Sequence, residues 1–414
     1  MNGIVAYAAY IPYFRLDRKA IAAALGQPAG KGTRAVASYD EDTTSMGVEA
    51  ARAALRGAPA LRPAGLYFAT AAPGYLDKTN ATAIHAALDL DPATAAFDML
   101  GSVRSGAGAL RAAVDAARPT LAVLSDIRTG LPGGADEREG GDAAVAFLCA
   151  EDSAEAPVLA EPIAWAHTTA EFLDRWRQPG AVASRQWEER FGEHAYAPLG
   201  EAAVTEALKQ AGITAQALDR LIVAGPHARA CKRVAASVGA PPAAVADDLG
   251  AVIGNTGTAH AGLLFADTLD RAAPDRLIAV VSLADGCDVT IWRTSAACAS
   301  PRANGTVARQ IAGGAGVPYA AFLTWRGFLD REPPRRPDPE RPAAPPSFRR
   351  EAWKFAFTGS RCQACGTRHV PPQRVCLKCH AVDRMAPERL SDVPAVIATF
   401  TVDRLAYSLS PPVV

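Results

Sequence analysis

The chain repeats one pattern of helix and strand, and this repetition constrains its fold more than any other feature. Residues 48–74, VEAARAALRGAPALRPAGLYFATAAPG, and residues 200–228, GEAAVTEALKQAGITAQALDRLIVAGPHA, each combine an alanine-rich helical segment, a turn and an apolar strand. Residues 105–130 and 255–286 form a second pair, in which small residues begin a helix that leads into another strand. This order predicts two diverged copies of one α/β unit.

The predicted strands are almost continuously apolar. They are residues 66–70, 121–126, 144–150, 220–225 and 277–284. Such runs are typical of central strands that are covered on both faces, whereas a strand with one solvent-exposed face alternates polar and apolar side chains. The sequence therefore predicts a layered α/β core in which the strands of each copy are buried between helices.

The composition excludes several classes of function. Lys plus Arg and Asp plus Glu both number 43, so the zero net charge gives no footprint for nucleic acid or an anionic membrane. The opening MNGIVAYAAYIPYF lacks the features of a secretory signal, and no apolar run approaches the ~20 residues that span a bilayer. Four cysteines are isolated, unlike those of a secreted disulfide framework: Cys149, Cys231, Cys287 and Cys298. A cytoplasmic protein is predicted.

Four further cysteines near the C-terminus form a metal-binding motif of two Cys-x-x-Cys pairs separated by ten residues. The predicted ligands are Cys362, Cys365, Cys376 and Cys379. Four thiolates complete a tetrahedral zinc site and leave no open position for a substrate, so the motif predicts one structural Zn²⁺. The segment is too short to bury its own core, and metal binding must therefore supply its folding energy. The neighbouring His369 and His380 are predicted to be surface residues.

The composition changes between the core and this motif, and again after it. Residues 329–350, LDREPPRRPDPERPAAPPSFRR, are rich in proline and charge and predict a semi-rigid linker. Residues 391–414 contain one β-type run, AVIATFTVDRLAYS. An OB-type barrel requires about five strands. We therefore expect only the start of such a barrel, either truncated or completed by another chain.

Several motifs resemble the 3-hydroxy-3-methylglutaryl-CoA synthases. In chain order they are GIVAYAAYIPYFRLDRKAIAAALG, DEDTTSMGVEAARAAL, GDAAVAFL, RFGEHAY and IGNTGTAHAGLLFADTLD. They resemble the ketoacyl-ACP synthases more distantly. The resemblance covers roughly residues 1–300 and implies a thiolase-like, five-layered α/β/α/β/α core with internal duplication. It also implies a homodimer that acts on acyl-CoA or acyl-carrier substrates.

The C-terminal part resembles the zinc-ribbon/OB-fold family that accompanies thiolase-like proteins as a separate subunit or as a fusion. A thiolase-like or OB-fold partner subunit is therefore a further expectation. Together with the changes in composition, the resemblances predict five segments. These are the N-terminal half of the core at 1–165, its C-terminal half at 166–328, the linker at 329–350, the zinc ribbon at 351–390 and the incomplete OB-fold at 391–414.

Two positions depart from the synthase pattern. In the synthases a cysteine at the start of a buried helix accepts the acyl group, because the helix N-terminus favours the thiolate. The matching stretch here, FDMLGSVRSGAGAL, has Val103 at that position. The segment that matches the one with the general acid–base glutamate, TAAPGYLDKTNAT, offers Ala71. Both replacements argue against chemistry through an acyl-cysteine.

Other site residues of the family are retained. His227, in VAGPHARACKR, matches the histidine that binds the acceptor carbonyl, and Asn255, in IGNTG, matches its asparagine partner. Together they are expected to form an oxyanion hole, although His227 can also be read as a hydrogen-bonded histidine at a strand end. Lys232 is expected either to contact the CoA phosphates or to be a solvated helix residue.

Four residues have weaker signals. Tyr75 is a candidate for proton transfer in a site that has lost its glutamate. Ser102 and Cys287 are candidate displaced nucleophiles, with a buried structural thiol as the alternative for Cys287. Asp142 is predicted to orient a turn near the dimer interface.

Three functional interpretations remain. The first is an acyl-CoA carbon–carbon bond enzyme, of aldol, retro-aldol or Claisen type, that needs no covalent intermediate. The second is an acyltransferase with a displaced Ser or Cys nucleophile, and the third is a non-catalytic acyl-CoA-binding or scaffold subunit. The missing cysteine favours the first and third, and the retained histidine and asparagine favour the first over the third.

Overall fold

The computed structural model describes every residue except 1, 29, 300–305, 334, 336–342 and 411–414. Part of the predicted linker and the last four residues of the predicted barrel segment therefore lie outside the described residues. The chain forms two compact units. One consists of Met1–Ala81 and Ala93–Leu329, and the other of Thr82–Pro92 and Asp330–Val414.

The first unit contains a nine-stranded mixed sheet. The N-terminal half of the core supplies β1 (Asn2–Tyr10), β4 (Gly65–Thr70), β5 (Ala95–Leu100), β6 (Thr120–Ile127) and β7 (Asp142–Glu151). The C-terminal half supplies β8 (Ala160–Thr169), β11 (Arg220–Ala224), β12 (Leu277–Ala284) and β13 (Gly286–Thr294). The strand order is β5-β4-β6-β7-β1-β8-β13-β12-β11. All five apolar runs of the sequence are strands of this sheet.

The topology of the sheet repeats as the sequence does. In the N-terminal half, β4 is parallel to β6, and β6, β7 and β1 follow in antiparallel pairs. In the C-terminal half, β11 is parallel to β12, and β12, β13 and β8 follow in the same antiparallel manner. The two halves meet where Ile4 of β1 pairs with Ala160 of β8. The predicted internal duplication is confirmed.

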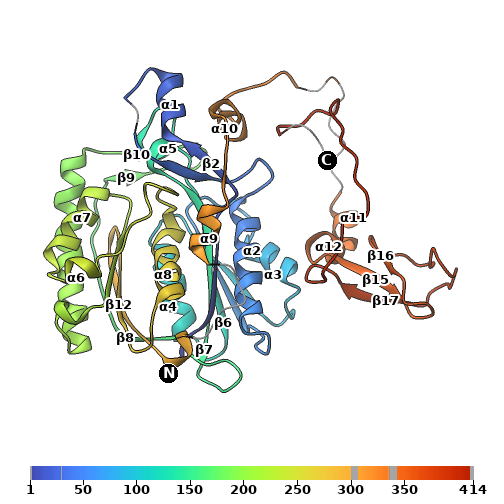
Figure 1. The fold of residues 1–414 in the computed structure, drawn as a ribbon, viewed down its shortest axis with the longest axis horizontal. Helices are drawn as coiled ribbons and strands as arrows, with labels where there is room; N and C mark the ends of the chain where they lie inside the picture. Colours follow the sequence, from blue (N-terminus) through green and yellow to red (C-terminus); the bar gives the residue numbers. More distant parts are fainter. Residues whose placement is uncertain (1, 29, 300–305, 334, 336–342, 411–414) are drawn as a thin grey trace. The chain divides into compact units, whose positions relative to one another are not determined.

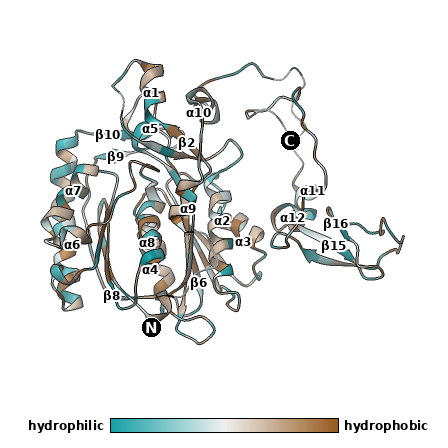
Figure 2. Cartoon of the chain, in the orientation of Figure 1, coloured by the Kyte–Doolittle hydropathy of each residue, from teal (hydrophilic) through white to brown (hydrophobic). Residues whose placement is uncertain are grey.

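Helices cover both faces of each half of the sheet. The main ones are α2 (Thr43–Arg56), α4 (Ser105–Asp115), α6 (Glu189–Ala211), α7 (Ala228–Ser237) and α8 (His260–Arg271). Figure 1 shows α4 and α8 between the two halves, α2 outside the N-terminal half, and α6 and α7 outside the C-terminal half. The ribbon of α4 and α8 is coloured largely for hydrophobic residues (Figure 2), and α8 is buried on nearly all sides. A helix of this kind is an internal layer, and the predicted five-layered thiolase-like core is confirmed.

Shorter elements complete the first unit. They are β2 (Phe14–Asp17), α1 (Arg18–Leu25), β3 (Thr33–Val36), α5 (Ala135–Glu139), β9 (Arg175–Trp176), β10 (Arg185–Gln186), α9 (Val307–Ala312), β14 (Ala315–Gly316) and α10 (Tyr319–Trp325). Among the described residues, no helix is both long and apolar enough to cross a membrane.

Asp142, at the start of β7, is a structural residue of this unit. Its buried carboxylate accepts hydrogen bonds from the backbone N–H groups of Ala37 (2.8 Å) and Arg128 (3.0 Å). It also pairs with the guanidinium groups of Arg34 (3.2 Å) and Arg326. This carboxylate therefore connects β3, β7 and the segment after α10, which is a structural role. That Asp142 lies near a dimer interface stays a prediction.

The second unit contains a small antiparallel sheet. Its elements are α3 (Ala81–Leu88), α11 (Ala344–Arg349), α12 (Glu351–Phe355), β15 (Thr358–Cys362), β16 (Arg368–His369) and β17 (Met385–Arg389). The strand order is β16-β15-β17. This three-stranded sheet holds the cysteine motif.

The predicted start of an OB-type barrel after the ribbon stays a prediction. Residues 391–410 contribute no strand to any described sheet. Val396 is 92% exposed, Ile397 82% and Leu405 98%. A strand is stable only when its backbone groups pair with a neighbour, and no described strand lies beside this segment to provide that pairing.

Candidate functional site

A small apolar cavity of about 40 Å³ lies between the central helices and the C-terminal half of the sheet. Val103, two residues before the first residue of α4, borders it. The helices α4 and α8 contribute Ala107, Leu110, Ala261 and Phe265, and the strands β8, β12 and β13 contribute Trp165, Val280, Ser282, Asp288, Thr290 and Trp292. Val103, which the sequence comparison predicts at the nucleophile position, thus faces a pocket of mostly apolar side chains.

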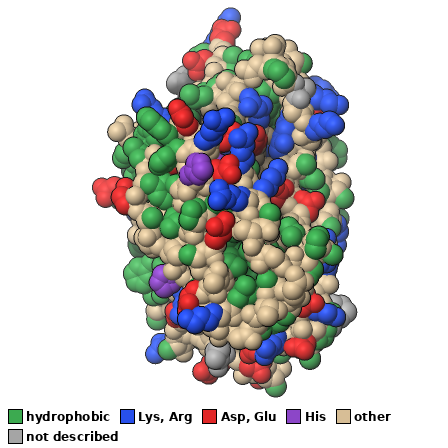
Figure 3. Space-filling model, turned by 90° about the vertical axis from the view of Figure 1, so that its left-hand side faces the viewer, with side chains coloured by type: hydrophobic (Ala, Val, Ile, Leu, Met, Phe, Trp, Pro, Cys, Tyr) green, Lys and Arg blue, Asp and Glu red, His purple; other side chains and the backbone are tan. Residues whose placement is uncertain are grey.

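A larger, polar cavity of about 840 Å³ adjoins this small one. Its basic lining residues are Arg18, Arg128, Arg138, Arg175, Arg229 and Lys232, and its acidic ones are Asp136, Glu139, Asp174, Glu189 and Asp248. Figure 3 shows basic and acidic side chains interspersed on the face of the molecule that includes α6 and α7. Both cavities share Ala224, Gly225 and Asn255 in their linings. Asn255 therefore lies at the junction between them.

Hydrogen bonds fix the orientation of the Asn255 side chain. Its Oδ1 accepts from the backbone N–H of Gly257 at 2.9 Å, and its Nδ2 donates to the carbonyl oxygen of Gly225 at 2.7 Å. The amide nitrogen carries two hydrogens. One is donated to Gly225, and no residue in the described part of the chain accepts the second.

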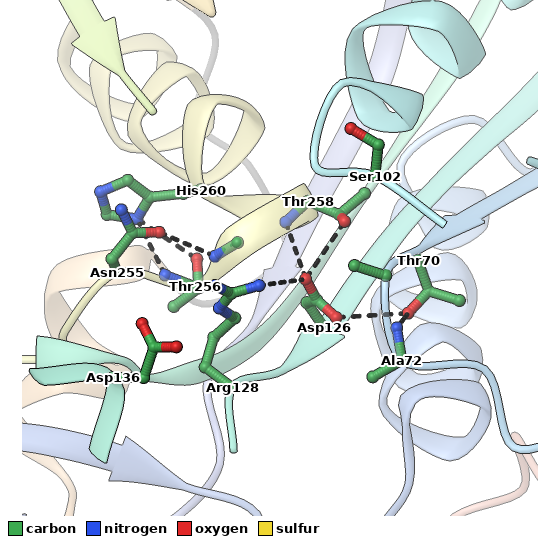
Figure 4. A network of polar contacts seen from close by, with 12 residues as sticks. Thr70, Ala72, Ser102, Asp126, Arg128, Asp136, Asn255, Thr256, Thr258 and His260 are labelled. Carbon is green, nitrogen blue, oxygen red and sulfur yellow. Dashed lines mark hydrogen bonds and ion pairs between the residues drawn. The ribbon is translucent and has the colours of Figure 1, made fainter. Parts of the chain in front are cut away.

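The loop after Asn255 is held by the buried carboxylate of Asp126, at the end of β6 (Figure 4). Asp126 Oδ2 accepts from the backbone N–H (3.0 Å) and the hydroxyl (3.1 Å) of Thr258, and the Arg128 guanidinium is 3.7 Å away. Burial raises the pKa of Asp126, although Arg128 and Thr258 oppose that shift. Gly257 has a φ of +56°, and a Cβ there would lie 2.2 Å from Asp126 Oδ2. Only glycine therefore fits between the carboxylate and the asparagine.

His260, the first residue of α8, supports the same loop. Its Nδ1 lies 3.3 Å from both the backbone nitrogen and the hydroxyl of Thr256. Burial lowers the pKa of His260 to about 4. The imidazole is therefore neutral near pH 7, with Nδ1 as the acceptor for the Thr256 N–H.

His227 lines the larger cavity, but both of its ring nitrogens are used by the backbone. As the N-cap of α7, its Nδ1 accepts from the N–H of Ala230 at 3.1 Å, and its Nε2 donates to the carbonyl oxygen of Glu189 at 2.8 Å. The ring also packs against Tyr196, with centroids 5.7 Å apart. In this arrangement no described residue accepts the second Nδ2 hydrogen of Asn255, whereas the Nε2 hydrogen of His227 is already donated to the Glu189 carbonyl. This geometry fits the alternative interpretation of His227 as a histidine that hydrogen-bonds the backbone. Its participation in an oxyanion hole stays a prediction.

Two other sequence candidates, Tyr75 and Ser102, line neither cavity. Tyr75 is 58% exposed, with Lys78 Nζ 5.4 Å from its ring centroid, and it lines neither cavity. The Ser102 hydroxyl accepts from the backbone N–H of Arg104 at 3.2 Å, and no dashed contact reaches Ser102 in Figure 4. No described hydrogen bond connects that hydroxyl to a histidine or carboxylate, so it lacks the base that a serine nucleophile needs.

Cys287 belongs to the core. It is fully buried in β13, in the hydrophobic cluster that includes residues of α6, and burial raises the pKa of its thiol. These properties match the structural alternative. Lys232, by contrast, is exposed on α7 and lines the larger cavity beside Arg229, where a phosphate contact stays a prediction.

Sequence reasoning missed an ion pair between the two halves of the core. Arg104, next to Val103, donates to the Asp288 carboxylate at 2.7 and 3.3 Å. The same guanidinium donates to the carbonyl oxygens of Asp285 (3.0 Å) and Thr168 (2.8 Å). The sequence signal for this ion pair was an arginine within a stretch of small residues.

Sequence reasoning also missed the role of Asp126 in holding the loop after Asn255. The sequence signal for that role was an acidic residue at the end of an apolar strand.

The four predicted metal ligands converge in the second unit. The sulfur atoms of Cys362, Cys365, Cys376 and Cys379 all lie within 4.8 Å of one another. The Sγ–Sγ distances are 3.6 Å for Cys362–Cys379 and 3.5 Å for Cys365–Cys376. Tetrahedral zinc with Zn–S bonds of about 2.3 Å requires sulfur separations of roughly 3.8 Å. The donor set and its geometry therefore fit Zn²⁺.

One prediction about the surroundings of this motif is wrong. His369 is buried, because it lies in β16 and pairs with Ser360 of β15, whereas the prediction made it a surface residue. His380 is exposed, as predicted.

Comparisons with known proteins agree with both units. Residues 355–383 match the family model "ChsH2, rubredoxin-like zinc ribbon domain". The hydroxymethylglutaryl-CoA synthase of Aeropyrum pernix is 30% identical over 299 residues, which cover 69% of this chain and 82% of that protein.

Solved structures share the fold of the first unit. An HMG-CoA synthase complexed with CoA matches with a TM-score of 0.68 at 15% identity, over 78% of this chain and 89% of the other. The 3-oxoacyl-[acyl-carrier-protein] synthase III from Aquifex aeolicus matches with a TM-score of 0.62 at 18% identity, over 71% of this chain and 100% of the other.

The duplicated topology and the buried central helices define a thiolase-like fold. Within that class, the chain belongs to the hydroxymethylglutaryl-CoA synthase family and has a rubredoxin-like zinc ribbon in its C-terminal part. Both resemblances seen in the sequence, to the synthases and to the zinc-ribbon proteins, are confirmed.

Proposed function

We propose that this chain binds an acyl-CoA and makes or breaks a carbon–carbon bond next to the thioester carbonyl without forming an acyl-cysteine. The observation that carries this proposal is the junction of the two cavities, where no described residue accepts the second Nδ2 hydrogen of Asn255. Val103, which lines the smaller cavity, is proposed to stand at the position of the nucleophile. The condensing enzymes of this family supply the reaction class.

The two cavities suit the two ends of an acyl-CoA. Arginine and lysine side chains in the larger cavity complement the phosphates of CoA, because charge-assisted hydrogen bonds to phosphate are strong. The apolar side chains of the smaller cavity suit a short acyl group. A thioester between them lies beside Asn255.

The proposed chemistry uses an enolate. When the bond between the α and β carbons breaks in the retro-aldol direction, its electron pair enters the thioester enolate, the β carbon becomes a carbonyl carbon, and the proton of the β-hydroxyl passes to solvent water. The enolate then takes a proton from water at its α carbon. Negative charge develops on the thioester oxygen, and the second Nδ2 hydrogen of Asn255 is proposed to stabilise it. His227 joins as a second donor only if its bond to the Glu189 carbonyl is released.

The cysteines of the first unit support a mechanism without a thiolate. Cys231 is the one cysteine in the described lining of the larger cavity, and the lining of the smaller cavity has none. Burial raises the pKa of Cys231 to about 12, which disfavours the nucleophilic form.

Other parts of the proposal concern assembly. We propose that the ribbon holds one structural Zn²⁺, whose ligands would be the four converging cysteines. The five-segment organisation, the homodimer and a thiolase-like or OB-fold partner subunit stay predictions.

Exchange of the α-hydrogens of an acyl-CoA tests the enolate directly. We expect the purified protein to catalyse deuterium uptake at the α-carbon of acetyl-CoA in D₂O, measured by NMR. Asn255→Ala should slow uptake by about 100-fold, the usual effect of losing one oxyanion donor. Binding of acetyl-CoA without any deuterium exchange would instead support a non-catalytic acyl-CoA-binding subunit. The hydrogen bonds of His227 to the backbone favour this alternative, because they leave its ring without a donor for the substrate.

The missing nucleophile provides a second test. Intact mass measured after incubation with acetyl-CoA should reveal no acyl adduct on the natural protein. Val103→Cys should gain an acetyl adduct, whereas Val103→Ser, a control of similar size without a thiol, should not. An adduct on the natural protein would overturn the proposed mechanism and favour an acyltransferase.

A further inference from the structure

We propose that Arg128 forms a carboxylate-binding site beside Asn255. The carbonyl compound that is joined to the acyl-CoA, or released from it, is accordingly a small oxo acid. This inference rests on the proposed function, because it places the carboxylate next to a thioester at Asn255. It adds the chemical class of the second substrate.

The Arg128 side chain lies against the loop that carries Asn255. Arg128 directly follows β6, and Figure 4 shows its side chain reaching from that strand toward the loop. A Cβ on Gly257 would lie 2.8 Å from Arg128 Cδ, and the Gly257 N–H donates to Asn255 Oδ1 at 2.9 Å. A Cβ on Gly140, which forms a β-bridge with Asn255, would lie 2.8 Å from Arg128 Cβ. Two glycines therefore make room for Arg128 next to Asn255.

The guanidinium of Arg128 has few partners. Its Nη1 is 3.7 Å from Asp126 Oδ2, which is beyond hydrogen-bond distance, and that oxygen already accepts two hydrogen bonds from Thr258. No hydrogen bond of the Arg128 guanidinium occurs among the described residues. A guanidinium offers several N–H donors in one plane, so this one has the capacity to bind a ligand.

The nitrogens of Arg128 face the larger cavity. Elsewhere in the described chain some arginine nitrogens are buried without a partner, such as Nε of Arg34 and of Arg326, but none of those belongs to Arg128. Its unbonded nitrogens are therefore accessible, although only 12% of the side chain is exposed. Arg128 and Asn255 line the same polar cavity, so an anion inside this cavity can reach both residues.

The other cations of this cavity differ from Arg128. Four arginines of the described lining already donate to a backbone carbonyl or pair with a carboxylate: Arg18, Arg138, Arg175 and Arg229. Lys232 is exposed on α7. Arg128 is thus the largely buried cation of the described lining that lacks a hydrogen bond.

The charges around Arg128 favour an anion. The charged side chains that act on it most strongly are Arg175, Asp126, Asp136 and Arg177. With Arg128 itself they comprise three arginines and two aspartates, so one positive charge is left over. Burial lowers the pKa of Arg128, and the nearby Arg175 lowers it further. A ligand carboxylate would supply the missing negative charge, and a planar guanidinium binds a carboxylate through two parallel hydrogen bonds.

A substrate carboxylate suits this position better than a CoA phosphate. The long pantetheine arm of CoA separates its phosphates from the thioester. A thioester at Asn255 therefore keeps the phosphates away from Arg128, whereas a carboxylate on the carbonyl compound lies close to the reacting carbons.

The proposed reaction needs no oxidant or reductant. In the aldol direction the α carbon of the acyl-CoA loses a proton to water and forms a bond to the ketone carbon of the oxo acid. The ketone oxygen takes a proton from water and becomes the β-hydroxyl, and the carboxylate is unchanged. The retro-aldol direction releases the oxo acid again.

Binding of pyruvate to the full chain tests the site, because pyruvate is the simplest methyl ketone with a carboxylate. Pyruvamide is the matched neutral probe, since an amide replaces the carboxylate at almost the same size. In NMR titrations with CoA at saturation, we expect pyruvate to bind at least about tenfold more tightly than pyruvamide, as for a charge-assisted hydrogen-bonded pair.

Substitutions separate the carboxylate from a phosphate. Arg128→Gln should reduce the preference for pyruvate over pyruvamide to about twofold or less, because the positive charge is lost. Arg128→Lys keeps the charge and should retain part of the preference. Neither substitution should change the affinity for CoA by more than about twofold. Lys232→Gln, at the position expected to contact a phosphate, should leave the preference for pyruvate intact.

The titrations of the natural protein decide the inference without any effect of substitution on folding. Equal affinities for pyruvate and pyruvamide, or no binding of pyruvate, would overturn it. A loss of CoA affinity in Arg128→Gln as large as the loss for pyruvate would assign Arg128 to a phosphate and also overturn it. Pyruvate is titrated without CoA as well. Failure of CoA to bind, which defeats the proposed function, is therefore distinguishable from failure of the carboxylate site.

Discussion

The thiolase-like core and the zinc ribbon are stabilised in different ways. The core buries two faces of a nine-stranded sheet and most of α8 among apolar side chains. The ribbon has three short strands, and two of its four cysteines are exposed. Apolar burial grows with size, whereas a segment as short as the ribbon needs a metal to offset its conformational entropy. The two parts should therefore respond to different perturbations.

Removal of zinc should produce the largest effect, and only in the ribbon. Structural zinc contributes about 10–16 kcal/mol to the folding of comparable peptides, so a chelator should unfold residues 358–389. Metal analysis should find one zinc per chain, and limited proteolysis should cut within the ribbon after chelation. Calorimetry should find the main core transition nearly unchanged. Simultaneous melting of the core would contradict this independence.

Asp142→Ala should destabilise the core by about 3–5 kcal/mol, because Arg34 and Arg326 would keep buried charges without their shared partner. Denaturant unfolding would measure the loss, and the zinc content of the ribbon should not change. Asp115→Ala is the matched control. It removes an exposed carboxylate that pairs with Arg111 on α4, and should cost under about 1 kcal/mol. Equal effects of the two substitutions would refute the assigned role of Asp142.

Acidification should weaken the core through His260. Its pKa is about 4 in the folded chain, below the ordinary value of 6.5, so the unfolded chain binds a proton more readily. The contribution is complete above pH 6.5 and is lost as the pH falls toward 4, with an upper limit of about 3 kcal/mol. Unfolding free energies measured between pH 7 and pH 4.5 should decline more steeply for the natural protein than for His260→Gln. Parallel declines would exclude His260 as the cause.

Loss of a helix cap should have the smallest effect. The Asp42 side chain accepts from the N–H of Ser45, and the Ser45 hydroxyl accepts from the N–H of Asp42, which together cap α2. Asp42→Ala should lower the stability of the core by about 1 kcal/mol, measured by thermal unfolding. Asp42→Asn keeps an acceptor oxygen and should retain most of that stability. A loss as large as that of Asp142→Ala would indicate a role beyond capping.

The repeated pattern and the cysteine spacing determined the fold predictions that succeeded. The apolar runs predicted the strands correctly because these strands are covered on both faces. The spacing of the cysteines predicted that their sulfur atoms converge, because coordination of one metal ion fixes their geometry. The run at 391–410, by contrast, forms no strand among the described residues. Its β propensity is local, whereas a strand also needs a neighbour that the described chain does not provide.

The candidate site was less predictable, because it depends on contacts between residues distant in sequence. His227 was predicted to match a family position, but the sequence does not reveal that its ring caps α7 and also reaches the Glu189 carbonyl. The contact of Asp126 with Thr258 joins residues 132 positions apart. The isolated indole N–H of Trp292 is a property of three-dimensional packing and has no sequence signature.

The cavity beside Trp292 also has a mechanical consequence. Hydrostatic pressure favours the state of smaller volume, and internal voids that disappear on unfolding make the unfolded chain the smaller state. The space between α4, α8 and β13 is therefore a weak point of the core under compression. A molecule that fills this space would make the protein harder to unfold by pressure, and the increase would report how completely the space is occupied.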